Sequence, residues 1–213
     1  MIETFAVVVL LLGDSQTQGT MGKSLEKTYT EQGVKVYREA SSGKGVDYFL
    51  NSLPKRQNSR TSENTLHDLL PDFVSYRQRS RIKNLARKSN YIIFGSLGGN
   101  DASRGCCVGN RRKALLKKYR KLFQTLCELD AIIIFNGSPR APNRKHQKFD
   151  KRRALVDQIQ EEASLNTCVI RNSTRNMLLS PDPDGYHYNK SGAAYAEFLM
   201  QLPGMKLPLQ EMK

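Results

Sequence analysis

Five short, predominantly apolar runs constrain the fold of this 213-residue chain more than any other feature. Continuous rather than alternating apolar character is expected of parallel strands that are covered on both faces. We therefore interpret each run as a buried strand. The five runs are Phe5–Leu12, Val34–Tyr37, Tyr91–Phe94, Ala131–Phe135 and Thr167–Ile170.

Amphipathic stretches of helical length lie between these runs. In the clearest, Asn110–Glu128, one apolar stripe includes Leu115, Tyr119 and Leu122, and Lys and Arg occupy much of the remaining surface. Alternating strands and helices predict an α/β fold: a three-layer α/β/α sandwich with a central, mostly parallel five-stranded sheet and right-handed crossovers. The other expected helices are Gly22–Gln32, Tyr76–Lys88, Gln147–Ala163 and Ser191–Met200.

The chain is long enough for one domain with a buried core and short for two. We expect a single domain over residues 1–202, followed by a C-terminal tail over residues 203–213 that wraps around the domain or frays. Two polar, proline-containing segments, Asn51–Thr65 and Gly137–Lys148, are interpreted as surface loops.

The formal net charge of +14 is unevenly distributed. Residues Arg77–Arg153 hold 21 Lys and Arg against four acids, whereas the remainder holds 13 against 16. Such an asymmetry is typical of a protein that contacts a polyanion, such as nucleic acid, an anionic polymer or a membrane surface. A charged surface that only keeps the protein soluble explains the same numbers, so the charge alone names no partner.

The four cysteines, Cys106, Cys107, Cys127 and Cys168, form no CxxC pair and have no histidine at metal-ligand spacing. We expect reduced, partly buried thiols and hence a reducing compartment. The apolar start of the chain lacks a basic segment before it and a cleavage site after it, and it is too short to span a bilayer. No later segment approaches transmembrane length, and we expect a protein that is cytoplasmic as synthesised.

Four polar clusters follow or lie near the carboxyl ends of predicted strands, where open α/β sheets bind ligands. They contain glycine together with serine, asparagine, aspartate or histidine. The clusters are Gly13-Asp14-Ser15-Gln16, Ser41-Ser42-Gly43-Lys44-Gly45, Gly98-Gly99-Asn100-Asp101 and Asp184-Gly185-Tyr186-His187.

In this order, the clusters resemble the conserved blocks of the GDSL/SGNH hydrolase superfamily and span nearly the whole domain. The first matches Gly-Asp-Ser, with Gln16 in place of the frequent leucine, the third matches Gly-x-Asn-Asp, and the last matches Asp-x-x-His. The second cluster is the weakest match, because either Gly43 or Gly45 fits its glycine. The Gly-x-Ser-x-Gly motif of α/β-hydrolases is absent. The resemblance implies a flavodoxin-like SGNH hydrolase fold.

The resemblance also implies roles for individual residues. Ser15 is the expected nucleophile, His187 its base, and Asp184 the residue that orients the imidazole and stabilises its charged form. The expected oxyanion hole consists of the backbone N–H of Ser15, the backbone N–H of Gly43 and the side-chain amide of Asn100.

Each residue has a structural alternative when it is considered alone. Ser15 could cap a helix, Asn100 and Asp184 could lie in turns, and His187 could be a surface histidine. The joint occurrence of the four clusters in family order favours the catalytic interpretation. The other two histidines, His67 and His146, are interpreted as surface residues.

Two classes of function follow. The first is a serine ester hydrolase without cofactor or metal, with acetylated carbohydrate or cell-wall glycan as the favoured substrate and a lipase or thioesterase type as the alternative. Without a leader segment, access to a wall polymer would require delivery in a virion or release by lysis. The second is a binding module that docks on a polyanion through the basic Arg77–Arg153 region. The oligomeric state is left open.

Overall fold

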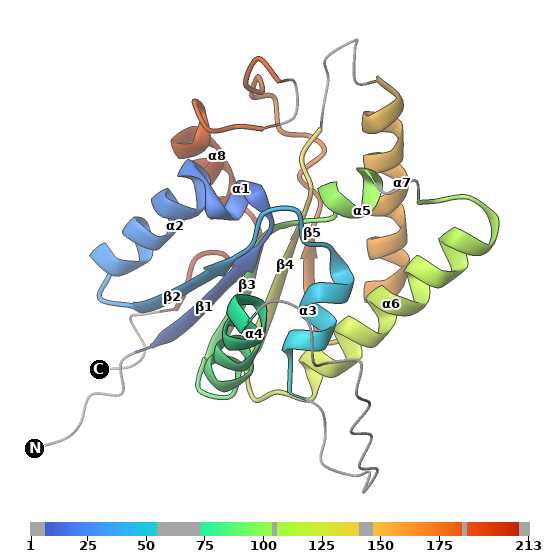
Figure 1. Ribbon diagram of the computed structural model, residues 1–213. Helices are drawn as coiled ribbons and strands as arrows, with labels where there is room; N and C mark the ends of the chain where they lie inside the picture. The colour runs from blue at the N-terminus through green and yellow to red at the C-terminus, as the bar shows by residue number, and fades with distance from the viewer. Residues whose placement is uncertain (1–6, 55–72, 104–105, 141–146, 185–186, 209–213) are drawn as a thin grey trace, which may run out of the picture.

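The computed structural model describes residues 7–54, 73–103, 106–140, 147–184 and 187–208 (Figure 1). Its five strands form one sheet in the order β2-β1-β3-β4-β5, and every neighbouring pair is parallel. The predicted α/β/α fold with a five-stranded sheet is therefore confirmed. The strands are β1 (Val8–Gly13), β2 (Lys35–Ala40), β3 (Tyr91–Leu97), β4 (Ile132–Gly137) and β5 (Ile170–Asn172).

Helices cover both faces of the sheet (Figure 1). The core on one face includes residues of α3, α4, α6 and α7, and the core on the other face includes residues of α2 and α8, which pack against each other. The helices are α1 (Ser15–Gln18), α2 (Thr20–Glu31), α3 (Val46–Ser52), α4 (Phe73–Ala86), α5 (Gly99–Ser103), α6 (Gly109–Cys127), α7 (Gln147–Ser164) and α8 (Gly192–Met200).

Alternation along β1 explains how one strand serves two cores. Leu10 and Leu12 point into the core beneath α3, α6 and α7, whereas Val9 and Leu11 point into the core beneath α2 and α8. All four side chains are fully buried. This is the physical reason for a continuous apolar run in a parallel strand, because neither face of the sheet meets water.

Three short helices were not predicted. They are α1, α3 and α5, with four, seven and five residues, which is too short for a helical period to be visible in the sequence. The predicted loop Asn51–Thr65 begins inside α3, and its residues 55–65 lie outside the described part of the chain. In the second predicted loop, β4 extends to Gly137 and α7 begins at Gln147, while residues 141–146 are not described.

The last strand lies further along the chain than its apolar run suggested. Thr167 belongs to the turn that ends α7, where its N–H donates to the Ser164 carbonyl, and β5 begins only at Ile170. After α8 the chain contributes Met205 to the second core. The Tyr29 hydroxyl donates to the Met205 carbonyl at 2.7 Å.

The expectation of reduced cysteines is wrong for this structure. Cys127, at the end of α6, and Cys168, just before β5, form a disulfide with their Cα atoms 5.6 Å apart, within the ordinary range. Cys106 and Cys107 are joined as well. The sequence separation of 41 between Cys127 and Cys168 carried no signal of their proximity, and the inference of a reducing compartment loses its basis.

A search of the helices in the described ranges finds none with both the length and the apolar character needed to cross a membrane.

Candidate active site

The polar clusters meet at the carboxyl edge of the sheet. They lie near the topological switch point, where the order in which strands are added to the sheet reverses. Strand β1 is followed by β2 on one side and flanked by β3 on the other, so the segments that leave β1, β2 and β3 diverge there. They border a pocket of about 420 Å³. The pocket is lined by Asp14, Ser15, Gln16, Ser42, Gly43, Gly99, Asn100, Phe149, Arg153 and His187.

Ser15 is placed by a tight junction between β1 and α1. A Cβ on Gly13 would lie 2.0 Å from Thr17 Oγ1, so only glycine permits this approach. The residue that caps α1 is Asp14, whose Oδ1 accepts from the Gln16 N–H at 3.0 Å. Ser15 is the first residue of the helix and not its cap, which removes the capping alternative for its hydroxyl.

Ser15, His187 and Asp184 form a chain of hydrogen bonds. Ser15 Oγ lies 3.0 Å from His187 Nε2, and His187 Nδ1 lies 2.5 Å from Asp184 Oδ2. The other carboxylate oxygen of Asp184 accepts from the His187 backbone N–H at 2.9 Å. His187 is half-buried and lines the pocket, so it is not an isolated surface histidine.

The loop that carries His187 is held by a second aspartate. Asp182 accepts from the backbone N–H groups of Asn189 and Lys190, at 2.9 and 3.0 Å, and its own N–H donates to the His187 carbonyl. Gly185 and Tyr186 lie outside the described residues, as do His67 and His146. These bonds fix the backbone of the loop that carries His187, and they do not depend on the bond between the imidazole and Ser15.

Gly43 and Asn100 also line the pocket. Asn100 Nδ2 donates to the Lys44 carbonyl at 3.0 Å, which ties the third cluster to the second. Gly45 serves packing: a Cβ there would lie 2.2 Å from Asp101 Oδ1. Of the two glycines that the sequence left open, only Gly43 is in the pocket lining.

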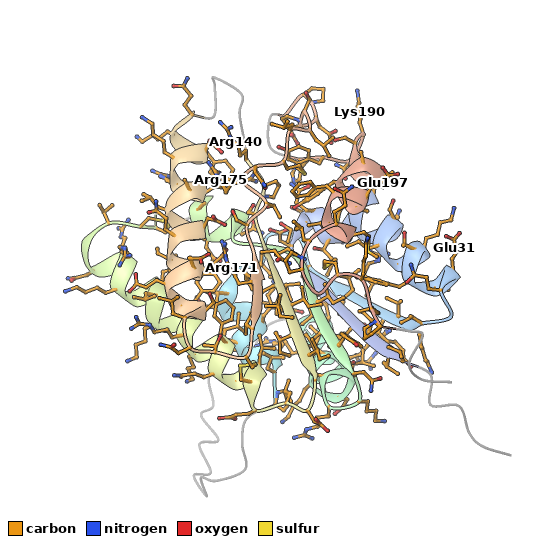
Figure 2. The ribbon with its side chains drawn as sticks, turned by 180° about the vertical axis from the view of Figure 1, so that it is seen from behind. Glu31, Arg140, Arg171, Arg175, Lys190 and Glu197 are labelled. Carbon is orange, nitrogen blue, oxygen red and sulfur yellow. A yellow bond between two sulfur atoms is a disulfide. The ribbon has the colours of Figure 1, made fainter. Side chains whose placement is uncertain are left out.

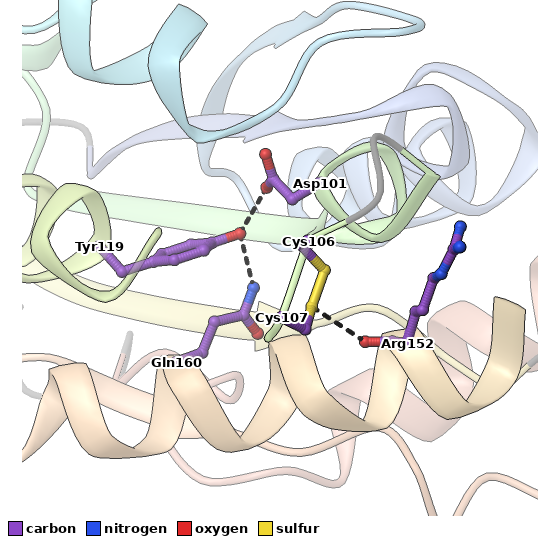
Figure 3. Close-up of a disulfide and its surroundings, with 6 residues drawn as sticks. All are labelled: Asp101, Cys106, Cys107, Tyr119, Arg152 and Gln160. Atoms are coloured by element: carbon purple, nitrogen blue, oxygen red, sulfur yellow. Dashed lines mark hydrogen bonds between the residues drawn. A yellow bond between two sulfur atoms is a disulfide. The ribbon is translucent and has the colours of Figure 1, made fainter. Parts of the chain in front are cut away.

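A buried network that the sequence did not reveal supports these loops (Figure 3). Asp101 accepts from the Tyr119 hydroxyl at 2.6 Å and from the Val46 N–H at 3.2 Å, and Gln160 Nε2 donates to the same hydroxyl and to the Leu97 carbonyl. The network thus links α3, α5, α6, α7 and the end of β3. Burial, together with the charge of Asp101, raises the pKa of Tyr119 well above its usual value, so the hydroxyl stays protonated as a donor.

Asp14 is a fully buried acid beside the candidate nucleophile. Burial raises its pKa to about 6, although the Gln16 N–H and the charge of Arg153 oppose that rise. Arg153, also missed by sequence reasoning, is 4% exposed and lines the pocket from α7. It lies in a run of basic residues, so nothing in the sequence distinguishes it from its exposed neighbours. Within the described ranges, no cluster of His, Cys, Asp and Glu is arranged to hold a metal ion.

No protein-family profile and no curated protein match the chain by sequence. Solved structures match by shape. An α/β hydrolase enzyme, LAE5, from the metagenome of Lake Arreo, Spain, has a TM-score of 0.64 at 12% identity, with 95% of this chain and 98% of that chain covered. An acetyl xylan esterase, Axe2, from Geobacillus stearothermophilus has a TM-score of 0.59 at 15% identity over 96% and 98%. TesA has a TM-score of 0.55 at 16% identity over 91% and 98%. These likenesses are of fold, and by fold this chain is similar to enzymes that include an α/β hydrolase and an acetyl xylan esterase.

Proposed function

We propose that this protein is a serine ester hydrolase of the SGNH type with Ser15 as its nucleophile. The observation that carries the proposal is the hydrogen-bonded chain Ser15–His187–Asp184, of which Ser15 and His187 line a pocket. A serine hydroxyl becomes nucleophilic only when a base removes its proton, and His187 Nε2 lies at hydrogen-bond distance for that task.

In the proposed reaction, Ser15 Oγ attacks the acyl carbonyl carbon while its proton passes to His187 Nε2. Collapse of the tetrahedral intermediate breaks the ester bond, and the alcohol leaves with that proton. Water then attacks the acyl-enzyme, His187 again takes a proton, and the acid and free Ser15 are released. Asp184 stabilises the imidazolium and holds the ring in the required orientation.

The negative charge of the tetrahedral intermediate needs preorganised donors. We assign the backbone N–H of Ser15, the backbone N–H of Gly43 and the side-chain amide of Asn100 to this role. The position of all three residues in the lining of one pocket supports the assignment.

An acetyl group on a carbohydrate or cell-wall glycan is the favoured substrate. A pocket of about 420 Å³ suits a small acyl group and one sugar unit, and Axe2, a structural neighbour, is an acetyl xylan esterase. Three further structures of Axe2 are described as catalytic mutants, in which a serine, a histidine and an aspartate are replaced by alanine. The same three residue types form the hydrogen-bonded chain here. A lipase or thioesterase type remains the alternative within the same chemistry.

Hydrolysis of 4-nitrophenyl acetate and labelling by a fluorophosphonate test the proposal. The wild-type protein should release nitrophenol and carry the label on Ser15, and Ser15→Ala should lose both. Ser80→Ala, which changes an exposed serine on α4, is the matched control and should keep both. Full activity and labelling in Ser15→Ala would refute the assignment. A panel of acetylated xylan, chitin oligomers, peptidoglycan and sialic acid, scored for released acetate, then identifies the acceptor.

A second candidate function is docking on a polyanion through the basic Arg77–Arg153 region. It is favoured by the exposure of Lys113, Lys117 and Lys121 on α6, none of which forms an ion pair with a described residue. Other cations of the same helix are paired: Arg112 and Arg120 contact Glu162, and Lys118 contacts Asp47.

Phosphate or sulfate contacts make such binding steeply salt-dependent. We expect retention on heparin that weakens between low and moderate salt, and that weakens further when the three lysines are changed to glutamate. Retention that is insensitive to salt would contradict electrostatic docking.

A further inference from the structure

A buried cation forms part of the wall of the proposed acyl pocket. Arg153 projects from α7, and its Nη1 donates to the Pro139 carbonyl at 2.9 Å and to the Arg140 carbonyl at 3.4 Å. Its guanidinium carbon lies 4.6 Å from the centre of the Phe149 ring, which also lines the pocket. The carbonyls and the ring hold the guanidinium plane in one orientation before any ligand binds.

Most of the donors of this guanidinium have no acceptor among the residues that the structure describes. Arginine has five N–H donors, and among the described residues only those on Nη1 find acceptors. Nε is buried without a hydrogen-bond partner in the described structure. Nη2 lies 3.3 Å from the position that a Cβ on Gly99 would occupy, so the unused edge borders the backbone next to Asn100. Buried, unsatisfied donors of a charged group are costly, and a ligand that accepts from them removes that cost.

The charge of Arg153 is also not neutralised by a direct contact. It forms no ion pair with a described residue, whereas the acid on the preceding turn of α7, Asp150, is bound by Arg175 at 2.9 Å. Figure 2 shows Arg140 and Arg175 beside this part of α7. The charge that acts most strongly on Arg153 is that of the buried acid Asp14, whose Oδ1 accepts from the Gln16 N–H. Asp14 acts on Arg153 through space, without a hydrogen bond between them.

We propose that Arg153 is a specificity-determining residue that binds a carboxylate on the substrate, so that the ester belongs to an acidic class such as an acetylated, carboxylate-bearing sugar. The planar fork of an arginine matches the two oxygens of a carboxylate. The net charge of +14 attracts an anion towards the protein at long range, and Arg153 supplies the short-range contact within the pocket. This inference rests on the proposed function for the identity of the reaction, and it has a binding test of its own.

The binding test compares benzoate with benzamide, which differ in charge and little in shape. Ligand-detected NMR titration of Ser15→Ala protein excludes turnover. We expect benzoate to bind at least tenfold more tightly than benzamide, and Arg153→Met to remove this difference, while Arg153→Lys keeps part of it. Lys151→Met, which changes an exposed cation two positions away, is the matched control for loss of one positive charge and should keep the difference.

The kinetic test compares 3- and 4-acetoxybenzoate with their methyl esters in wild-type protein, Arg153→Met and Lys151→Met. We expect kcat/KM to favour the carboxylates by at least tenfold in wild type and in Lys151→Met. In Arg153→Met the carboxylate-to-ester ratio should fall by tenfold or more. An equal fall for both substrates indicates a structural role and overturns the proposal.

The two tests separate the possible failures. Equal binding of benzoate and benzamide to the Ser15→Ala protein overturns the carboxylate subsite, even if Arg153→Met does not fold. Selective binding of benzoate without hydrolysis of any acetate ester retains the subsite and refutes the proposed esterase.

Discussion

Replacement of Asp14 by asparagine should make the protein more stable at neutral and basic pH, although it removes a charge next to the proposed nucleophile. Burial raises the pKa of Asp14 from 3.8 to about 6. The folded protein therefore binds this proton more tightly than the unfolded chain does. The contribution of Asp14 to the free energy of unfolding is fully present below pH 3.8, and it is lost as the pH rises through 6.

A difference of about two pKa units corresponds to about 3 kcal/mol at pH 8. Asparagine keeps the N-cap of α1, because its side-chain oxygen also accepts from the helix N–H groups. At any pH, the Asp14→Asn protein thus resembles wild-type protein in which Asp14 is protonated. In both, no negative charge at residue 14 acts on Arg153. We expect equal stabilities near pH 4 and an advantage of about 3 kcal/mol for the variant at pH 8, or roughly 6–12 °C in Tm.

Urea unfolding of both proteins at intervals from pH 4 to pH 8 measures this difference. The other ionisable groups are common to both proteins, so their contributions largely cancel. The exposed Asp130→Asn is the control for the loss of one negative charge. A stability difference that stays constant over the whole range, or a variant that is less stable at pH 8, would refute the reasoning about burial.

Three further predictions concern the site and its support. Gly45→Ala should lower kcat/KM by about ten- to a hundredfold, since its Cβ must displace Asp101 or the loop that carries Gly43. In the control, Gly33→Ala, no atom lies within 4 Å of the Cβ position but φ is +79°, so the variant should lose some stability and keep its kcat/KM. Asn100→Ala should lower kcat by roughly 10²–10³-fold with little change in KM, because an oxyanion donor acts mainly in the transition state. Steady-state kinetics measures both constants, and an effect on KM alone would contradict the proposed role of Asn100 as an oxyanion donor. Cys127→Ser combined with Cys168→Ser should lower the free energy of unfolding by about 4 kcal/mol, the loop-closure value for 41 residues. Reductant should destabilise wild type more than the double variant, which keeps only the bond between Cys106 and Cys107. A double variant as stable as wild type would argue against the bond between Cys127 and Cys168.

The sheet could be predicted from the sequence because its physical signal is local. Buried parallel strands require consecutive apolar residues, and the runs that end near Leu12 and Phe94 meet this condition. The candidate triad was reached through the family resemblance of its motifs, which combines residues 172 positions apart. A local pattern by itself does not bring Ser15 and His187 together.

Features that depend on tertiary contacts could not be predicted. Tyr119 was assigned to an apolar stripe, and its hydroxyl bond to Asp101 depends on where α5 and α6 meet. Arg153 lies among exposed cations in sequence and becomes buried only because α7 packs beside the pocket. The different surroundings of Gly43 and Gly45 likewise depend on the position of Asp101, because a Cβ on Gly45 would meet its carboxylate.

The separation of Ser15 from His187 has a consequence during synthesis of the chain. At about 5–20 residues per second, the ribosome makes the imidazole on the order of ten to thirty seconds after the serine. All five strands are complete before His187 is made, and α8, which packs on α2, follows it. A nascent chain can thus form much of its sheet before His187 exists, so the proposed hydrolytic centre would be among the last parts of the protein to be assembled.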